Sequence, residues 1–155
     1  MPTQLQAITD FFTERVPRDW FSAPCDVAAD PHEILVEGAL AEGQDPAEFR
    51  ARTREQRMRI AAEAEATFAR KVSWGVRCGD RRLRFTGLGV PVMTRLRFDE
   101  RAVLDTLVDA GIARSRSEAL AWCARLVGKH QADWITQLRD AHEAVRRIAE
   151  QGPEL

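Results

Sequence analysis

Hydrophobic residues in the first half of the chain follow two different periods. In residues 3–16 they recur at helical spacing and predict a short amphipathic helix, with the stripe Leu5, Ile8, Phe12 and Val16. Residues 18–31 hold aromatic and turn-forming residues and are interpreted as an irregular loop partly pinned by its aromatics. Residues 33–40 are predicted to be a strand. Asp45-Pro46 then predicts a helix start, because Asp caps free N–H groups and Pro is tolerated in the first turn; this helix is expected to run to about Ala69.

Clean alternation predicts a β-hairpin in the middle of the chain. From 71 to 78, Val72, Trp74, Val76 and Cys78 fall on one side; Gly79-Asp80 supplies a turn, and Leu83 and Phe85 continue the apolar side in the return strand. The opposite side carries a possible extra basic face, made of Lys71, Arg77, Arg82 and Arg84. This face either adds to a contact with an anionic partner or is simply solvated. The arginines at 52, 54, 57 and 59 of the preceding helix are interpreted as a solvated face.

The stretch from 92 to 127 combines an alternating segment with two short helical ones. In residues 92–98, Val92, Leu96 and Phe98 alternate with Met93, Arg95 and Arg97, which predicts a strand with one apolar and one cationic face. Helical spacing follows from 101 to 110, and Gly111 suits a helix end. Ser115-Arg116-Ser117-Glu118 then marks a second helix start, because a serine oxygen accepts from the first free N–H groups.

A third amphipathic helix is predicted near the C-terminus, to about Glu150. Its apolar stripe is Trp134, Ile135, Leu138, Ala141, Val145 and Ile148. This stripe must be buried either against the core of its own chain or against a second subunit. The predicted fold class is therefore α+β: an α+β module with a hairpin over 1–87, a strand-helix-helix unit over 88–130, and a C-terminal helix over 131–155.

Composition excludes several classes of protein. The 155 residues are 45% hydrophobic and 30% charged, which is typical of a globular protein. We expect a cytoplasmic protein without a membrane partner, because no run of about 18 apolar residues and no signal-like N-terminus occurs. The three scattered cysteines fit a reducing compartment. Lysine occurs only at Lys71 and Lys129 among 23 basic residues, a bias typical of a GC-rich bacterial genome.

Charge is distributed unevenly along the sequence. Positions 1–50 hold three basic and ten acidic residues, a net charge of −7, and positions 51–90 hold ten basic and four acidic residues, a net charge of +6. The two parts either neutralise each other in the fold or leave the basic part for an anionic partner.

The ordered set of motifs between 92 and 127 resembles the ribbon-helix-helix family, also called MetJ/Arc-type. The likeness is carried by residues 96–100 (LRFDE), 104–107 (LDTL) and 115–120 (SRSEAL). The resemblance implies an intertwined homodimer, or a higher homo-oligomer, that binds double-stranded DNA. Two copies of residues 92–98 would pair as an antiparallel ribbon in the major groove.

The resemblance also implies roles for single residues. Met93, Arg95 and Arg97 would contact bases, because an outward arginine can donate two hydrogen bonds to guanine. Ser115, Arg116 and Ser117 would contact a phosphate at the helix N-terminus. The alternative for Arg95 and Arg97 is a strand edge guarded by charge against aggregation.

The sequence predicts a dimeric bacterial DNA-binding transcriptional regulator, associated with the nucleoid when bound to DNA. The alternative is an oligomerising interaction protein, or an antitoxin-like protein that binds a partner, with little or no DNA affinity. Such a protein partner would bind through residues 1–87. No catalytic residue, metal site or cofactor is predicted, since no nucleophile elbow, phosphate loop or His-Glu-x-x-His pattern occurs and each His and Cys is interpreted as structural.

Overall fold

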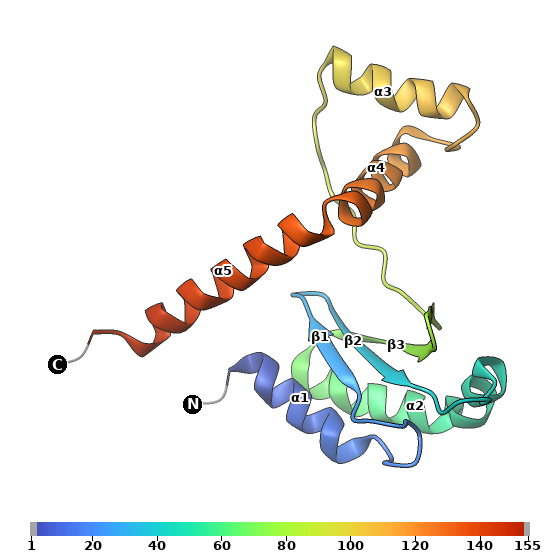
Figure 1. Ribbon diagram of the computed structural model, residues 1–155, viewed down its shortest axis with the longest axis vertical. Helices are drawn as coiled ribbons and strands as arrows, with labels where there is room; N and C mark the ends of the chain where they lie inside the picture. The colour runs from blue at the N-terminus through green and yellow to red at the C-terminus, as the bar shows by residue number, and fades with distance from the viewer. Residues whose placement is uncertain (1–2, 154–155) are drawn as a thin grey trace. The chain divides into compact units, whose positions relative to one another are not determined.

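The computed structural model describes residues 3–153, which divide into two compact units between Val92 and Met93. Unit 1 contains α1 (Gln4–Arg15), β1 (Asp26–Ala29), β2 (Glu33–Ala39), α2 (Pro46–Phe68), β3 (Lys71–Cys78) and β4 (Arg81–Arg84). Unit 2 contains α3 (Phe98–Asp109), α4 (Arg116–His130) and α5 (Ala132–Gln151). The predicted α+β class is confirmed (Figure 1).

The four strands form one mixed sheet in the order β1-β2-β3-β4. Strands β2 and β3 are parallel, and α2 connects them; the two outer pairs are antiparallel. The predicted hairpin is confirmed: Cys78 pairs with Arg81, and Gly79 adopts a φ of 58°, which glycine tolerates best. In Figure 1, α1 and α2 lie on the same side of the sheet.

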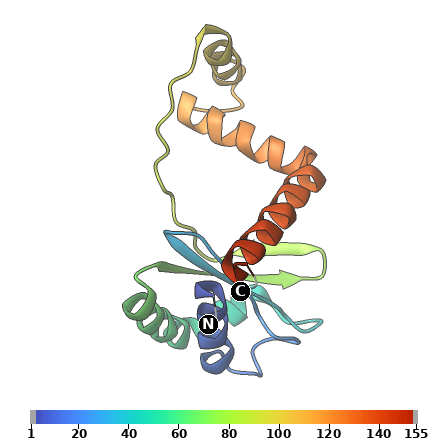
Figure 2. The ribbon, with the colours of Figure 1, turned by 90° about the vertical axis from the view of Figure 1, so that its left-hand side faces the viewer.

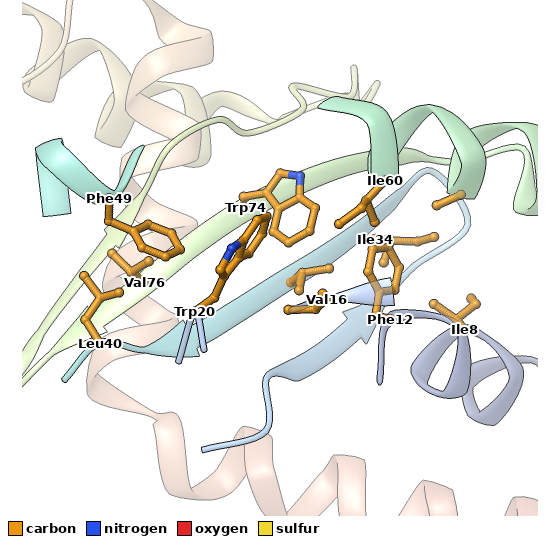
Figure 3. Close-up of a cluster of buried hydrophobic side chains, with 12 residues drawn as sticks. Ile8, Phe12, Val16, Trp20, Ile34, Leu40, Phe49, Ile60, Trp74 and Val76 are labelled. Carbon is orange, nitrogen blue, oxygen red and sulfur yellow. The ribbon is translucent and has the colours of Figure 1, made fainter. Parts of the chain in front are cut away.

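An aromatic-rich core fills the space between these helices and the sheet (Figure 3). Trp74 is central to it: its ring lies 6.1 Å from that of Trp20 and 5.9 Å from that of Phe12, both edge to face. Phe49 from α2 contacts Trp20 at 5.8 Å between ring centroids. The alternation predicted for β3 is confirmed, since Val72, Trp74, Val76 and Cys78 all pack on this core.

Helix α2 has the ends that its sequence predicts. The Asp45 carboxylate accepts a hydrogen bond from the Ala47 N–H at 3.3 Å, and Pro46 is the first helical residue. Ala69 closes the helix in the left-handed region, with a φ of 55°. The predicted span from Asp45-Pro46 to about Ala69 is therefore confirmed.

Strand β1 is a feature that the sequence interpretation missed. Residues 18–31 were expected to be an irregular loop, yet Asp26–Ala29 pairs antiparallel with β2, Val27 opposite Val36. Three of its four residues are exposed, so its side chains show no period. Pairing with a neighbouring strand, rather than its own pattern, makes it a strand. The aromatic anchor of the loop is confirmed by Trp20, which is buried.

Unit 2 has a small core. Helices α3 and α4 pack together around Leu104, Ala113 and Ala119, the three buried residues of this cluster. Helix α4 continues through Gly128 to His130, and after the single residue Gln131 the separate helix α5 starts (Figure 2). No residue of α5 that the structure describes is buried.

None of the helices between residues 3 and 153 is both long and apolar enough to cross a bilayer.

Candidate nucleic-acid interface

The segment before α3 is extended and exposed but is not a strand. In the described chain, residues 88–97 form no ladder with another segment, and Figure 2 shows them as plain coil. Val92 is 84% exposed, Met93 95% and Phe98 75%. The prediction of a strand over 92–98 with Val92, Leu96 and Phe98 on a buried face is therefore wrong for the single chain. The physical reason is that a strand needs a partner for its backbone groups.

Two hydrogen bonds fix the C-terminal end of this segment to α3. The Arg97 N–H donates to the Glu100 carboxylate at 2.7 Å, and the Arg101 guanidinium donates to the Leu96 carbonyl at 2.6 Å. Leu96 also packs on the unit 2 core. Phe98, expected to end a strand, is instead the first residue of α3. The C-terminal end of the segment is thus tied to α3, while residues 88–95 are exposed.

Arg95 and Arg97 are not neutralised within the described chain. Neither guanidinium lies within ion-pair distance of a carboxylate among residues 3–153. Met93, Arg95 and Arg97 are all exposed in this segment. This arrangement suits contact with an anion.

The predicted start of α4 is confirmed. The Ser115 hydroxyl accepts the Glu118 N–H at 3.1 Å, and the Glu118 carboxylate accepts the Arg114 N–H at 2.8 Å. That second bond, with a further one from the Arg114 guanidinium, lowers the pKa of Glu118 below its ordinary value. Gly111, with a φ of 76°, closes the preceding turn. The Ser115 hydroxyl thus caps the Glu118 N–H, in the first turn of α4.

Arg116 is partly occupied by a contact inside unit 2. Its guanidinium donates two hydrogen bonds, of 2.8 and 2.9 Å, to the two carboxylate oxygens of Asp105 on α3. The hydrogen bonds lower the pKa of Asp105 and raise that of Arg116. A phosphate at this helix end would therefore meet the backbone N–H groups and Ser117 before it met a free Arg116.

The predicted basic face of the hairpin belongs to unit 1, on the side of the sheet opposite the core. Its charges are largely compensated by neighbouring acids, because each of its cations has a carboxylate within 3.4 Å. The pairs are Arg77–Asp26 at 2.5 Å, Arg82–Glu37 at 3.0 Å, Arg84–Glu37 at 3.4 Å and Lys71–Glu65 at 3.3 Å.

Glu37 is the residue of this face that the sequence interpretation missed. It is only 5% exposed, and its Oε1 accepts no hydrogen bond although the Arg84 Nε lies 3.4 Å away. A buried carboxylate with two arginines neutralises the middle of the face. Acidic residues from positions 1–50 and basic residues from positions 51–90 contact each other here. This favours the interpretation that the two parts neutralise each other in the fold.

The arginines of α2 differ in exposure, which the sequence interpretation did not predict. Arg52, Arg54 and Arg59 are exposed as expected, but Arg57 is 6% exposed. Its guanidinium donates to the Thr53 hydroxyl at 3.0 Å and to the Arg50 carbonyl at 2.7 Å, and lies 4.9 Å from the Phe85 ring centroid. Burial lowers the pKa of Arg57. Its interpretation as part of a solvated face is wrong, because the α2 spacing places it on the buried side.

A cavity of about 440 Å³ lies beside the end of α1, lined by Phe12, Val16, Arg18, Phe21, Cys25 and neighbouring loop residues. Burial raises the pKa of the Cys25 thiol. No group of three or more His, Cys, Asp or Glu side chains in residues 3–153 is placed to hold a metal ion.

Both units of the chain match known protein families. Residues 6–84 match the family model described as Rv1265-like protein, N-terminal domain, and residues 97–149 match the Mb1296 C-terminal domain. The chain is 49% identical to the uncharacterized protein Rv1265 of Mycobacterium tuberculosis and to the uncharacterized protein Mb1296 of Mycobacterium bovis, over 94% of this chain and 70% of each relative. No solved structure matches the chain.

These matches correct the resemblance drawn from residues 92–127. The match over residues 97–149 includes α3, α4 and most of α5, and it is to the Mb1296 C-terminal domain, not to a ribbon-helix-helix family. The resemblance was wrong because its motifs report local features, a capped helix start and a glycine turn, that many two-helix units share.

Proposed function

The chain belongs to the family of Rv1265-like proteins, and we propose that it is a bacterial DNA-binding transcriptional regulator that acts as a homodimer in the cytoplasm, on the nucleoid when bound to DNA. The observation that carries this proposal is the exposed segment with Arg95 and Arg97, whose charges lack a carboxylate partner in the described chain. The proposal assigns no catalytic reaction and no cofactor.

In the proposed mechanism the exposed segment pairs with the same segment of a second copy of the chain. Two copies of residues 92–98 pair as a short antiparallel ribbon, which satisfies their backbone groups and fits the width of the major groove. Met93, Arg95 and Arg97 then face the bases. Each arginine that donates two hydrogen bonds to guanine contributes about 1–3 kcal/mol of discrimination against the wrong base.

The α4 N-terminus supplies a second, sequence-independent contact in this proposal. The N–H groups of its first turn and the Ser117 hydroxyl hold a backbone phosphate, and Ser115 positions them by capping the helix. Arg116 adds to this contact when one of its two hydrogen bonds to Asp105 is replaced by a hydrogen bond to the phosphate. The hairpin basic face is assigned no direct role, since its cations are paired with acids.

The test measures binding of the full chain to random-sequence duplex DNA at several salt concentrations. Arg95→Ala/Arg97→Ala is expected to weaken binding by a factor of ten or more, because it removes two cations from the segment proposed to contact DNA. The matched control, Arg139→Ala/Arg147→Ala, removes the same charge from exposed positions of α5 and should leave binding nearly unchanged.

Two results would contradict the proposal. One is DNA binding that is insensitive to salt and unchanged in Arg95→Ala/Arg97→Ala. The other is an equal loss in the control pair, which would mean that only the net charge matters.

The alternative function is an oligomerising interaction protein with little DNA affinity. It is favoured by the engagement of Arg116 with Asp105 and by the apolar side chains that unit 2 exposes. Absence of DNA binding by the unaltered chain, together with a stable oligomer, would select this alternative.

A further inference from the structure

Helix α5 confines its acidic residues and arginines to one side. Its positions are named a to g in a seven-residue repeat in which Leu138 is a. Every Asp, Glu and Arg of the helix then falls at b, c or f, the outer positions: Asp133, Arg139, Asp140, Glu143, Arg146, Arg147 and Glu150. The remaining four positions carry no Asp, Glu, Lys or Arg along the whole helix.

The a and d positions carry an apolar series with alternating steps of four and three residues. The series is Trp134, Leu138, Ala141, Val145 and Ile148. This is the spacing with which one helix packs against another in a coiled coil, knobs into holes. At about 1.5 Å per residue the helix is about 30 Å long, so the series covers most of its length.

Unit 2 does not cover this face. Trp134 is 56% exposed, Leu138 52%, Val145 63% and Ile148 69%. Monomeric proteins seldom leave a contiguous apolar strip of this kind in solvent, and such strips mark interaction sites. The face therefore needs a partner from outside the described unit.

The flanking positions show which partner fits. At e and g the helix has Ile135, Gln137, His142, Ala144, Ala149 and Gln151, so two identical helices approach each other without like-charge repulsion. Charges at e and g set partner choice in coiled coils, and α5 has no Asp, Glu, Lys or Arg at these positions to exclude a second copy of itself.

The outer face argues against a lipid surface as the partner. It holds three arginines against four acids, whereas helices that lie on membranes carry an excess of Lys and Arg on the polar side. Arg146 is also satisfied within the helix, 2.9 Å from Glu143 and 3.8 Å from Glu150. These charges are solvated and leave the other face for association.

We infer that α5 is a homodimerisation helix, whose face of Trp134, Leu138, Ala141, Val145 and Ile148 packs against the same face of a second copy of this chain. This pairing goes beyond the proposed DNA binding and does not depend on it. It places the main subunit contact in α5 and not in residues 92–98.

The experiment is sedimentation equilibrium of the full chain over a range of concentrations, without DNA. The unaltered chain is expected to be a dimer. Leu138→Asp/Val145→Asp puts two charges on the paired face and should raise the dissociation constant by roughly 30-fold or more. The matched control, Ala132→Asp/Thr136→Asp, adds the same charge at the exposed b and f positions and should stay dimeric.

A second, uncharged variant separates loss of pairing from loss of folding. Leu138→Gln/Val145→Gln keeps good helix formers in exposed positions, so far-ultraviolet circular dichroism should still show a folded chain while the dimer weakens. A chain that is monomeric at all concentrations would overturn the inference. A dimer unaffected by both α5 variants would also overturn it and would leave the proposed ribbon as the interface.

Discussion

The two units bury their apolar side chains to very different extents. Among residues 3–153, twelve hydrophobic residues form the buried core of unit 1, whereas the buried residues of the unit 2 core are Leu104, Ala113 and Ala119. Unit 1 gathers Trp20, Trp74 and several phenylalanines between its helices and its sheet, while α5 keeps its Trp134 in solvent.

The difference separates a unit with a large buried core from a unit with a small one. A core of three small or medium side chains gives little stabilisation, at about 25 cal/mol per Å² of buried apolar surface. Unit 2 also holds the exposed segment with Arg95 and Arg97. The exposed apolar side chains of α5 and the two exposed arginines, Arg95 and Arg97, therefore all lie in unit 2.

The largest effect is expected from breaking the core of unit 1. Phe12 is fully buried against Trp74, and Phe12→Ala removes a ring from a packed site. We expect a loss of about 3–5 kcal/mol in the free energy of unfolding, measured by urea denaturation followed by tryptophan fluorescence. Met58→Ala, at a residue that is 58% exposed on α2, should change it by less than about 1 kcal/mol. Equal losses in the two variants would mean that the core of unit 1 does not hold it together.

A smaller effect is expected at the start of α4 in unit 2. Ser115→Ala removes the acceptor of the Glu118 N–H and should cost about 1 kcal/mol of stability, seen as faster hydrogen exchange in the first turn of α4. Ser115→Asp should restore most of it, and Ser117→Ala, which removes no cap, is the matched control. Unchanged exchange in Ser115→Ala would show that packing with α3 alone fixes this helix end.

The smallest effect is a pH dependence from the pair between α3 and α4. Because hydrogen bonds from Arg116 hold the pKa of Asp105 below its ordinary value near 3.8, the pair stabilises the fold above that value. This stabilisation is lost as the pH falls through the lower, folded-state pKa. The difference in urea midpoint between the unaltered chain and Asp105→Asn should therefore be constant at neutral pH and shrink below about pH 4. A difference that grows on acidification would have the wrong sign for this pair.

The parts of the fold that the sequence predicted are those where a local signal and a tertiary contact agree. Asp45-Pro46 caps α2, and the alternation of residues 71–78 packs one side on the core, so both predictions are confirmed. The same reasoning failed for residues 92–98, because alternation describes side chains and does not supply a neighbouring strand. Strand β1 was missed for the opposite reason: β2 supplies the pairing that its own residues do not signal.

At the candidate site, the sequence predicted the capped start of α4, but it did not predict the ion pair that Arg116 forms there with Asp105. Arg116 was expected to be free for a phosphate, and only the packing of α4 on α3 brings Asp105 to it. Arg57 had a signal that was overlooked: it lies four residues after Thr53 and three before Ile60, both buried on α2. Helical spacing alone would have placed it inside.

The central claim is that unit 2 is completed by a second copy of the chain through α5. Hydrogen exchange of the unaltered chain at low and high protein concentration tests it most directly, since exchange reports the protection of each helix separately. Protection of the α5 amides should increase with concentration, while protection of the β2 and β3 amides of unit 1 should stay constant. Rapid exchange of α5 at every concentration, or equal changes in the two units, would contradict the claim.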